Sequence, residues 1–140
     1  MNEKHWKWFG RAAHFICGND CRFHMATQVG NYLISTVGEY LPDSQVREIM
    51  AKSRGIKLEG KGDAREAEFL AANGYEDIGY QRKYETMVFL AGPPCRRKDC
   101  GCGVPKINGR ELDFKGYNTA KDATEGHMEL CLKWSKKKPQ

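Results

Sequence analysis

Hydrophobic and polar residues alternate most clearly in the first third of the chain. In the segment 22–29 (RFHMATQV), every second residue from Phe23 to Val29 belongs to one side, which predicts a half-buried strand. Gly30-Asn31 then predicts a two-residue hairpin loop, because both residues tolerate positive φ. The β-branched and aromatic segment 32–37 (YLISTV) predicts the returning strand. A further strand is expected at 11–17, before the turn cluster at 18–20.

The period changes to a helical one after residue 43. Val46, Ile49 and Met50 recur at helical spacing, with Asp43 or Ser44 as the N-cap and Gly55 as the stop. A second helix is expected from Asp63 to Asn73, with its inward side formed by Ala67, Leu70 and Ala71. A short strand is expected at 56–59, and the segment 83–90 (KYETMVFL) predicts a longer one that ends before Gly92-Pro93-Pro94.

The last third of the chain begins with an irregular, glycine-rich stretch. Residues 95–114 show no clear period, and Asn108-Gly109 predicts a tight turn within them. A third helix should begin after Asn118 or Thr119 and run to about Lys136. Its inward stripe is expected to contain Ala120, Ala123, His127, Leu130, Cys131 and Trp134.

This order of elements predicts an α+β fold. It comprises an antiparallel sheet with two to three helices and a C-terminal zinc-stabilised loop–helix appendage. Residues 1–94 would form the α+β core. Residues 95–140 would supply the Cys-rich loop and the C-terminal helix, packed on that core within a single compact domain.

Composition narrows the class of protein. With 40% hydrophobic and 29% charged residues in 140, the chain differs from collagen-like, low-complexity and disordered proteins. The apolar runs are too short to cross a bilayer, and the first six residues lack the apolar core of a secretory signal. We therefore expect a cytoplasmic protein that does not enter membranes.

The basic residues are concentrated in two short runs. Lys and Arg number 23 against 18 Asp and Glu, for a net charge of +5. The two runs are Arg96, Arg97 and Lys98, and, near the end of the chain, Lys133, Lys136, Lys137 and Lys138. Such runs are more typical of solvated charge than of phosphate contacts, so nucleic-acid binding is an alternative and not the leading hypothesis.

The spacing of the cysteines indicates a metal site. Three of the six lie in one loop as Cys95-x4-Cys100-x-Cys102, and His127 and Cys131 share one face of the third helix. Three thiolates and one ligand from the helix, either His127 or Cys131, complete the tetrahedral set that zinc prefers, and metal binding would order the loop. Two alternatives stay open. The first is a disulfide and a free thiol in the loop, and the second is that His127 and Cys131 are ordinary core residues of the helix.

A second set of ligand-type residues surrounds the turn at 18–20. A hairpin there would bring together His14, Cys17, Cys21 and His24. These residues could form a second metal site, although buried cysteines beside hydrogen-bonded histidines explain the pattern as well.

Catalytic sets are incomplete in this sequence. Pro94-Cys95 is similar to part of the zinc nucleobase deaminase signature, but no His or Cys precedes a Glu at the required upstream spacing. The segment 67–89 resembles the last conserved part of GNAT-type acetyltransferases, yet a pyrophosphate-binding loop is not evident. A Cys–His nucleophile near the turn at 18–20 would lack an orienting group. The sequence therefore favours a protein that is not an enzyme, with a GNAT-like acyltransferase or another zinc enzyme as the alternative.

Several blocks spread over the whole chain resemble a family of small proteins encoded by tailed phages and prophages of proteobacteria. The blocks lie at 5–10 (HWKWFG), 13–30, 32–40 (YLISTVGEY), 46–49, 74–79, 82–89, 100–103 (CGCG) and 111–118 (ELDFKGYN). The resemblance implies action in the host cytoplasm during infection or lysogeny, and it carries over no functional residues. The leading hypothesis is a zinc-stabilised accessory protein that binds a host or phage macromolecule, most readily a protein, in host takeover or in countering host defence.

Overall fold

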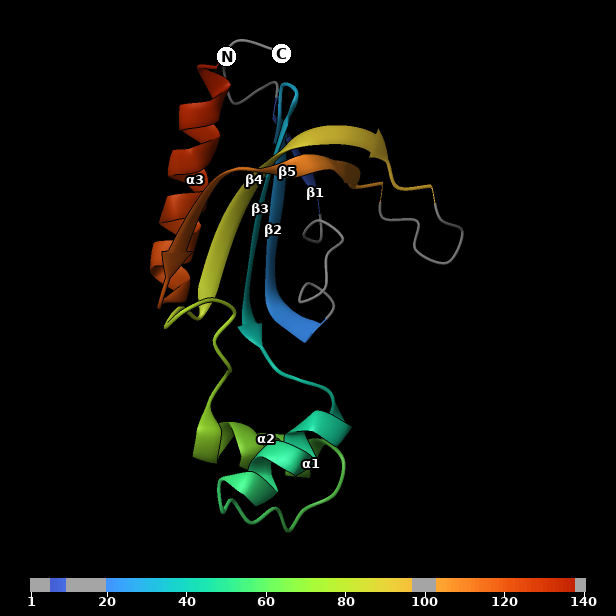
Figure 1. Ribbon diagram of the computed structural model, residues 1–140, viewed down its shortest axis with the longest axis vertical. Helices are drawn as coiled ribbons and strands as arrows, with labels where there is room; N and C mark the ends of the chain where they lie inside the picture. Colours follow the sequence, from blue (N-terminus) through green and yellow to red (C-terminus); the bar gives the residue numbers. More distant parts are fainter. Residues whose placement is uncertain (1–5, 10–19, 97–102, 138–140) are drawn as a thin grey trace.

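The computed structural model describes residues 6–9, 20–96 and 103–137. The elements within these residues follow in chain order (Figure 1): β1 (Trp6–Phe9), β2 (Cys21–Val29), β3 (Tyr32–Tyr40), α1 (Ser44–Ser53), α2 (Asp63–Asn73), β4 (Tyr84–Pro94), β5 (Pro105–Tyr117) and α3 (Ala120–Ser135). This order confirms the α+β class. The strand predicted at 11–17 lies outside the described residues.

The five strands form one sheet in the order β1-β2-β3-β4-β5, and every neighbouring pair is antiparallel. Helix α3 lies against one face of this sheet (Figure 1). Helices α1 and α2 lie together beyond one end of the sheet, and with the segments next to them (residues 41–75) they form a helical lobe. Among the described residues, no helix combines the length and the apolar character needed to span a membrane.

Strand β2 shows the predicted alternation. Val29 joins the core beneath α3, whereas Ala26 packs with Leu33 on the opposite face of the sheet. The hairpin between β2 and β3 is confirmed at residues 30–31, where Gly30 takes a positive φ of 60°. Strand β3 is buried from Tyr32 to Gly38 because it lies at the centre of the sheet with both faces covered.

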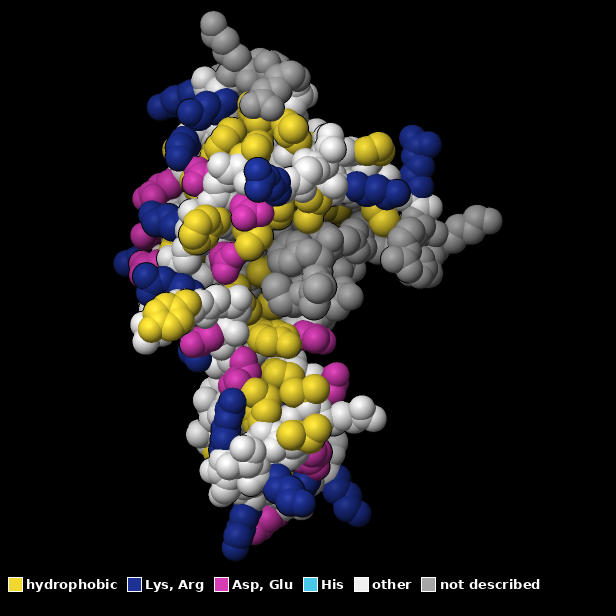
Figure 2. Space-filling view, viewed as in Figure 1, with side chains coloured by type: hydrophobic (Ala, Val, Ile, Leu, Met, Phe, Trp, Pro, Cys, Tyr) yellow, Lys and Arg dark blue, Asp and Glu magenta, His cyan; other side chains and the backbone are white. Residues whose placement is uncertain are grey.

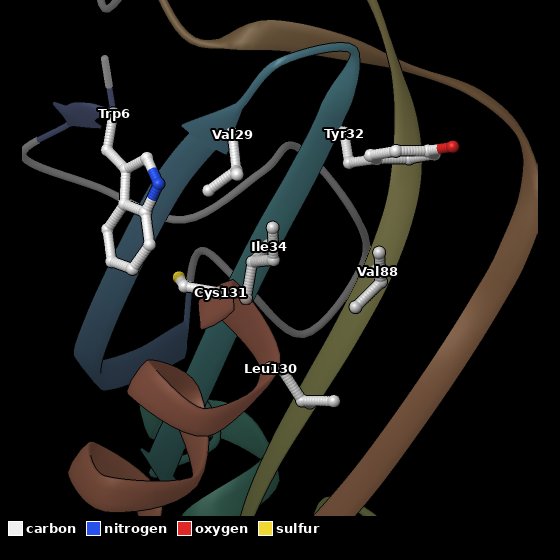
Figure 3. Packing of buried hydrophobic residues seen from close by; sticks show 7 residues of the cluster. All are labelled: Trp6, Val29, Tyr32, Ile34, Val88, Leu130 and Cys131. Carbon is white, nitrogen blue, oxygen red and sulfur yellow. The ribbon is translucent and has the colours of Figure 1, made fainter. Parts of the chain in front are cut away.

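Helix α3 begins and faces inward as predicted. Thr119 is its N-cap, and the Thr119 side chain accepts a hydrogen bond from the Asp122 N–H at 3.1 Å. Of the predicted stripe, the fully buried members are Ala123, His127, Leu130 and Cys131. Figure 3 shows Leu130 and Cys131 among the strand residues of the core that they share with Trp6, Val29, Tyr32, Ile34 and Val88. Burial of a side chain such as Leu130 contributes about 2 kcal/mol to stability.

In the helical lobe only some of the apolar residues identified in the sequence face the core, where Met50 and Leu70 pack. Asp43 caps α1 as predicted, but Val46 and Ile49 are 41% and 69% exposed. Helix α2 spans Asp63 to Asn73 as predicted, its N-cap is Gly62, and its buried residue is Phe69. Ala67 and Ala71 are exposed, and Leu70 is only partly buried. These helices pack mainly on each other and on the segment 56–58, and the strand predicted at 56–59 is not formed. Arg22 of β2 forms an ion pair with Glu66 of α2.

The irregular texture predicted for residues 95–114 is also wrong in its second half. Residues 105–117 form the 13-residue strand β5, and β4 continues through Gly92 to Pro94 to pair with it. Asn108-Gly109 makes no chain-reversing turn. It lies in a bulge where the register changes from Val88↔Asp113 to Leu90↔Asn108, and Gly109 supplies the positive φ of 82° that the bulge uses. The C-terminal third thus provides both the edge strand and the helix that covers the sheet.

Candidate functional site

A buried histidine from α3 contacts hydroxyl groups on the sheet below it. His127 Nε2 lies 2.9 Å from the Thr27 hydroxyl on β2, and His127 Nδ1 lies 2.6 Å from the Thr36 hydroxyl on β3. The Thr36 hydroxyl lies a further 2.6 Å from that of Thr86 on β4. The three threonines stand on adjacent strands and face α3, because Thr36 pairs with Thr86 in register and Thr27 is on the inward side of β2. We call these four residues the His127 network.

The imidazole in this network is neutral. His127 is fully buried, and burial lowers its pKa from 6.5 to about 4. A neutral imidazole has one N–H donor and one acceptor nitrogen, so one threonine hydroxyl accepts from His127 and the other donates to it. Both ring nitrogens are therefore engaged within the protein.

Cys131 lies one helical turn beyond His127, on the same face of α3. Burial raises the pKa of its thiol to about 12, although a hydrogen bond with Thr27 opposes this effect. The thiol is consequently protonated at neutral pH, and a protonated thiol is a poor nucleophile.

Tyr117 and Trp8 border the network on two sides. The Tyr117 ring packs so closely on α3 that a Cβ added to Gly126 would lie 2.1 Å from it. Burial raises the pKa of Tyr117, and its buried hydroxyl has no hydrogen-bond partner among the described residues. On the other side, the Trp8 ring lies 5.8 Å from the His127 ring while Trp8 itself is 49% exposed. All four residues of the network are fully buried, and its geometry suits it to fixing α3 on the sheet.

Sequence reasoning identified His127 and Cys131 but missed their partners. Thr27 and Thr36 were predicted only as members of the strands at 22–29 and 32–37. The available signal was the presence of threonines at core-facing positions of three strands, where an apolar residue is the usual choice.

The structure does not bring the predicted loop ligand Cys95 near His127 and Cys131. Cys95 is buried just beyond the end of β4, where its N–H donates to the Val104 carbonyl at 2.8 Å. Cys131 packs instead with Val88. Val88 lies in β4 roughly 20 Å before Cys95, measured along the strand at about 3.3 Å per residue. Cys100 and Cys102 lie outside the described residues. In the part of the chain that is described, no three His, Cys, Asp or Glu side chains converge as metal ligands.

The second predicted ligand set is described in half. Cys21 is buried at the start of β2 and packs against Val37. The neighbouring His24 Nε2 donates to the Cys21 carbonyl at 2.5 Å. His14 and Cys17 lie outside the described residues, so this site stays a prediction.

The two basic runs are also partly described. Lys133, Lys136 and Lys137 lie at the end of α3, and Arg96 is exposed beyond β4, whereas Arg97, Lys98 and Lys138 lie outside the described residues. Figure 2 shows positive and negative side chains mixed over the helical lobe, with further Lys and Arg side chains toward the opposite end of the molecule.

A polar pocket of about 410 Å³ lies between β5 and the first turns of α3. Its charged lining is mixed: Arg82, Lys115, Asp122, Glu125 and Glu129. Lys115 and Glu129 pair with each other at 3.3 Å, so part of this charge is already neutralised within the protein.

Comparison of the chain with protein-family models, curated proteins and solved structures gives no significant match.

Proposed function

We propose that the chain is a non-enzymatic binding protein, active in a phage-infected or lysogenic bacterial cell, whose target is a protein contacted through α1. The observation that carries the proposal is the exposure of two large aliphatic side chains on one side of that helix. Val46 and Ile49 are three residues apart and 41% and 69% exposed. Exposed aliphatic side chains that cluster on one helix face are typical of protein contact surfaces.

The helical lobe explains why this side of α1 is available. Its core is built on the other side of the helix, from Ala51 together with Leu41 and Phe69, and Met50 packs against them. Stability of the lobe therefore places no demand on Val46 and Ile49. Gln45, Lys52 and Ser53 are exposed residues of the same helix, so the apolar pair has a polar border, as contact surfaces commonly do.

The environment of His127 and Cys131 supports a binding role over an enzymatic one. Both residue types are common in catalysis, but here the imidazole is neutral, the thiol is protonated, and neither side chain is exposed. The alternative of a GNAT-like acyltransferase gains no support from α2, which packs in the helical lobe and not against β4.

Site-specific crosslinking tests the proposal. A photoreactive phenylalanine analogue replaces Ile49 in one variant and the exposed Lys57 of the same lobe in a control. In a lysate of phage-infected bacteria, we expect a discrete nuclease-resistant protein adduct at position 49 that Val46→Ser weakens, and no such adduct at position 57. Equal labelling at both positions, or none at position 49, contradicts the proposal.

The proposal keeps one structural zinc ion on Cys95, Cys100 and Cys102. Its support is the spacing of these thiols, together with the position of Cys95 where β4 leads into that loop. Zinc content measured on protein purified without chelators should be one ion per chain and should fall when Cys95, Cys100 or Cys102 is changed to Ser. Cys21→Ala is the matched control. Loss of zinc in that control alone would assign the metal to the second ligand set, and absence of zinc from the unaltered protein would contradict both.

A further inference from the structure

The last strand of the sheet, β5, has no partner strand along its outer edge in the described part of the chain (Figure 1). Its regular part, residues 113–117, pairs with β4 on the other side without a break. Phe114, within this part, is 65% exposed. Its neighbour Asp113 accepts a hydrogen bond from Trp134 of α3 at 3.0 Å, so strand alternation directs Phe114 to the face of the sheet opposite to α3. Among the described residues, the outer edge of β5 is therefore available to a further strand.

The charges on this edge change sign at Phe114. Asp113 lies directly before it and Lys115 directly after it, and both side chains form ion pairs with α3. Charged side chains on an edge strand usually prevent two copies of a chain from pairing. Here, an antiparallel copy centred on Phe114 places Asp113 of each chain opposite Lys115 of the other, which is favourable. A twofold axis one residue away, at Asp113 or at Lys115, would oppose like charges, so the charges select the register centred on Phe114.

The flank of α3 that borders this edge shows the same change of sign. Lys115 Nζ lies 3.3 Å from the Glu129 carboxylate, and Lys133 Nζ lies 2.8 Å from the Asp113 carboxylate. Four exposed charged residues follow one another at intervals of four along this flank, and we call them the α3 stripe: Glu125, Glu129, Lys133 and Lys137. Neighbouring members of the stripe line two common surface pockets. The first half of the stripe is thus acidic, and the second half is basic.

The charge patterns of β5 and of the α3 stripe share one centre. The ion pairs between the two elements place Phe114 beside the middle of the stripe, between Glu129 and Lys133. A single twofold axis at this point therefore brings the acidic half of each stripe to the basic half of the other. Asp122 and Lys136, which line the same two pockets, extend the two halves with matching signs. A twofold interface between identical chains requires such self-complementarity, whereas an interface with a different protein does not.

We propose that two copies of this chain form a twofold-symmetric dimer, in which the β5 strands pair in antiparallel orientation and the α3 stripes lie side by side. Phe114 meets its counterpart at the axis, and a cross-strand pair of aromatic rings is favourable. Attraction between the stripes fixes the orientation and the register of the two chains. Val46 and Ile49 belong to α1 and not to this surface, so each copy keeps them exposed for the target.

Sedimentation equilibrium of the full chain at about 10 to 300 μM and low salt tests this inference, with a reversible equilibrium between monomer and dimer as the expected result. The variant Glu125→Lys/Glu129→Lys makes the α3 stripe wholly basic, and Lys133→Glu/Lys137→Glu makes it wholly acidic. Each variant alone should show a dimer dissociation constant at least about tenfold higher, because like charges then face each other. An equimolar mixture of the two variants should associate as a heterodimer, because a basic stripe then faces an acidic one.

The matched control, Lys52→Glu/Lys57→Glu, makes the same change of charge at two exposed positions of the helical lobe and should dimerise as the unaltered protein does. Phe114→Lys places like charges at the axis and should weaken association as the stripe variants do, and thermal melts verify that each variant folds. The inference is overturned if the unaltered chain stays monomeric throughout this range, or if mixing the two stripe variants restores no association. It is also overturned if the control loses as much association as they do. Crosslinking at position 49 detects a different surface, so its result is independent of this one.

Discussion

His127 Nδ1 lies 2.6 Å from the hydroxyl of Thr36, and this contact joins the covering helix α3 to the central strand β3. The same hydroxyl lies 2.6 Å from that of Thr86, so Thr36 links the helix to two strands at once. A polar contact in the middle of an apolar layer favours one position of α3 on the sheet. In any other position of the helix a buried hydroxyl or imidazole would be unpaired.

Thr36 should therefore contribute more to stability than Thr86, although both are fully buried threonines. Thr36→Val removes the partner of both His127 and Thr86, and we expect the free energy of unfolding in urea to fall by about 2–3 kcal/mol. Thr86→Val leaves the contact between Thr36 and His127 intact and should cost about 1 kcal/mol. Equal losses in the two variants would show that Thr36 has no linking role.

The stability of the protein should depend on pH through His127. Its pKa is about 4 in the folded chain and 6.5 in the unfolded chain. The unfolded state therefore binds more protons between these values, and the stabilisation present above pH 6.5 is lost as the pH falls toward 4. The full effect is about 3 kcal/mol. Cys131 and Tyr117 keep their protons throughout this range, because burial raises both of their pKa values.

Urea unfolding at pH 7.0, 6.0 and 5.0 measures this dependence, with His127→Gln as the variant that cannot titrate. The unaltered protein should lose stability over this range, and the variant should lose much less. His24→Gln serves as the control because His24 is only partly buried, and it should retain the dependence of the unaltered protein. A control that removes the dependence would assign it to His24.

Hydrophobic periodicity could predict only those helices and strands that bury one side against the core. The alternation in β2 and the stripe of α3 both report burial on a single face, so the strand, the helix and the shared face of His127 and Cys131 could be predicted. The partner of His127 could not be predicted in the same way. Thr36 precedes it by 91 positions, and only the packing of α3 on the sheet brings the two together.

Strand β5 was missed because an edge strand does not need the alternating hydrophobic residues of a strand that packs on the core. Only Pro105 and Tyr117, at its two ends, are buried, and the bulge at Gly109 interrupts what alternation exists. The buried side of α1 could not be predicted for a related reason. Val46 and Ile49 carry the apolar signal, but the partners that decide which side is buried, such as Phe69, belong to another helix.

Gly126 should be intolerant of substitution even though it lies within a helix. Alanine favours helix formation over glycine by about 1 kcal/mol, which alone would stabilise the protein. A Cβ at this position would, however, lie 2.1 Å from the buried ring of Tyr117. We expect Gly126→Ala to lower the free energy of unfolding by about 2–3 kcal/mol. The neighbouring exposed residue provides the control, since Glu125→Ala should change stability by less than about 0.5 kcal/mol. A Gly126→Ala variant more stable than the unaltered protein would show that α3 can move away from Tyr117.

Trp8 should control the access of solvent to His127. The Trp8 ring lies 5.8 Å from the imidazole, and its own 49% exposure shows that it forms the outer boundary at this point. In Trp8→Ala, water reaches the imidazole, so the penalty that burial imposes on the charged form decreases and the pKa of His127 should rise from about 4 toward 6.5. Titration of the histidine ring protons by NMR, assigned with His127→Gln, measures this shift. Trp8→Phe keeps a ring over the imidazole and should leave the pKa near its original value. If the pKa of His127 is the same in Trp8→Ala as in the unaltered protein, other residues of the core shield His127 from water, and Trp8 does not.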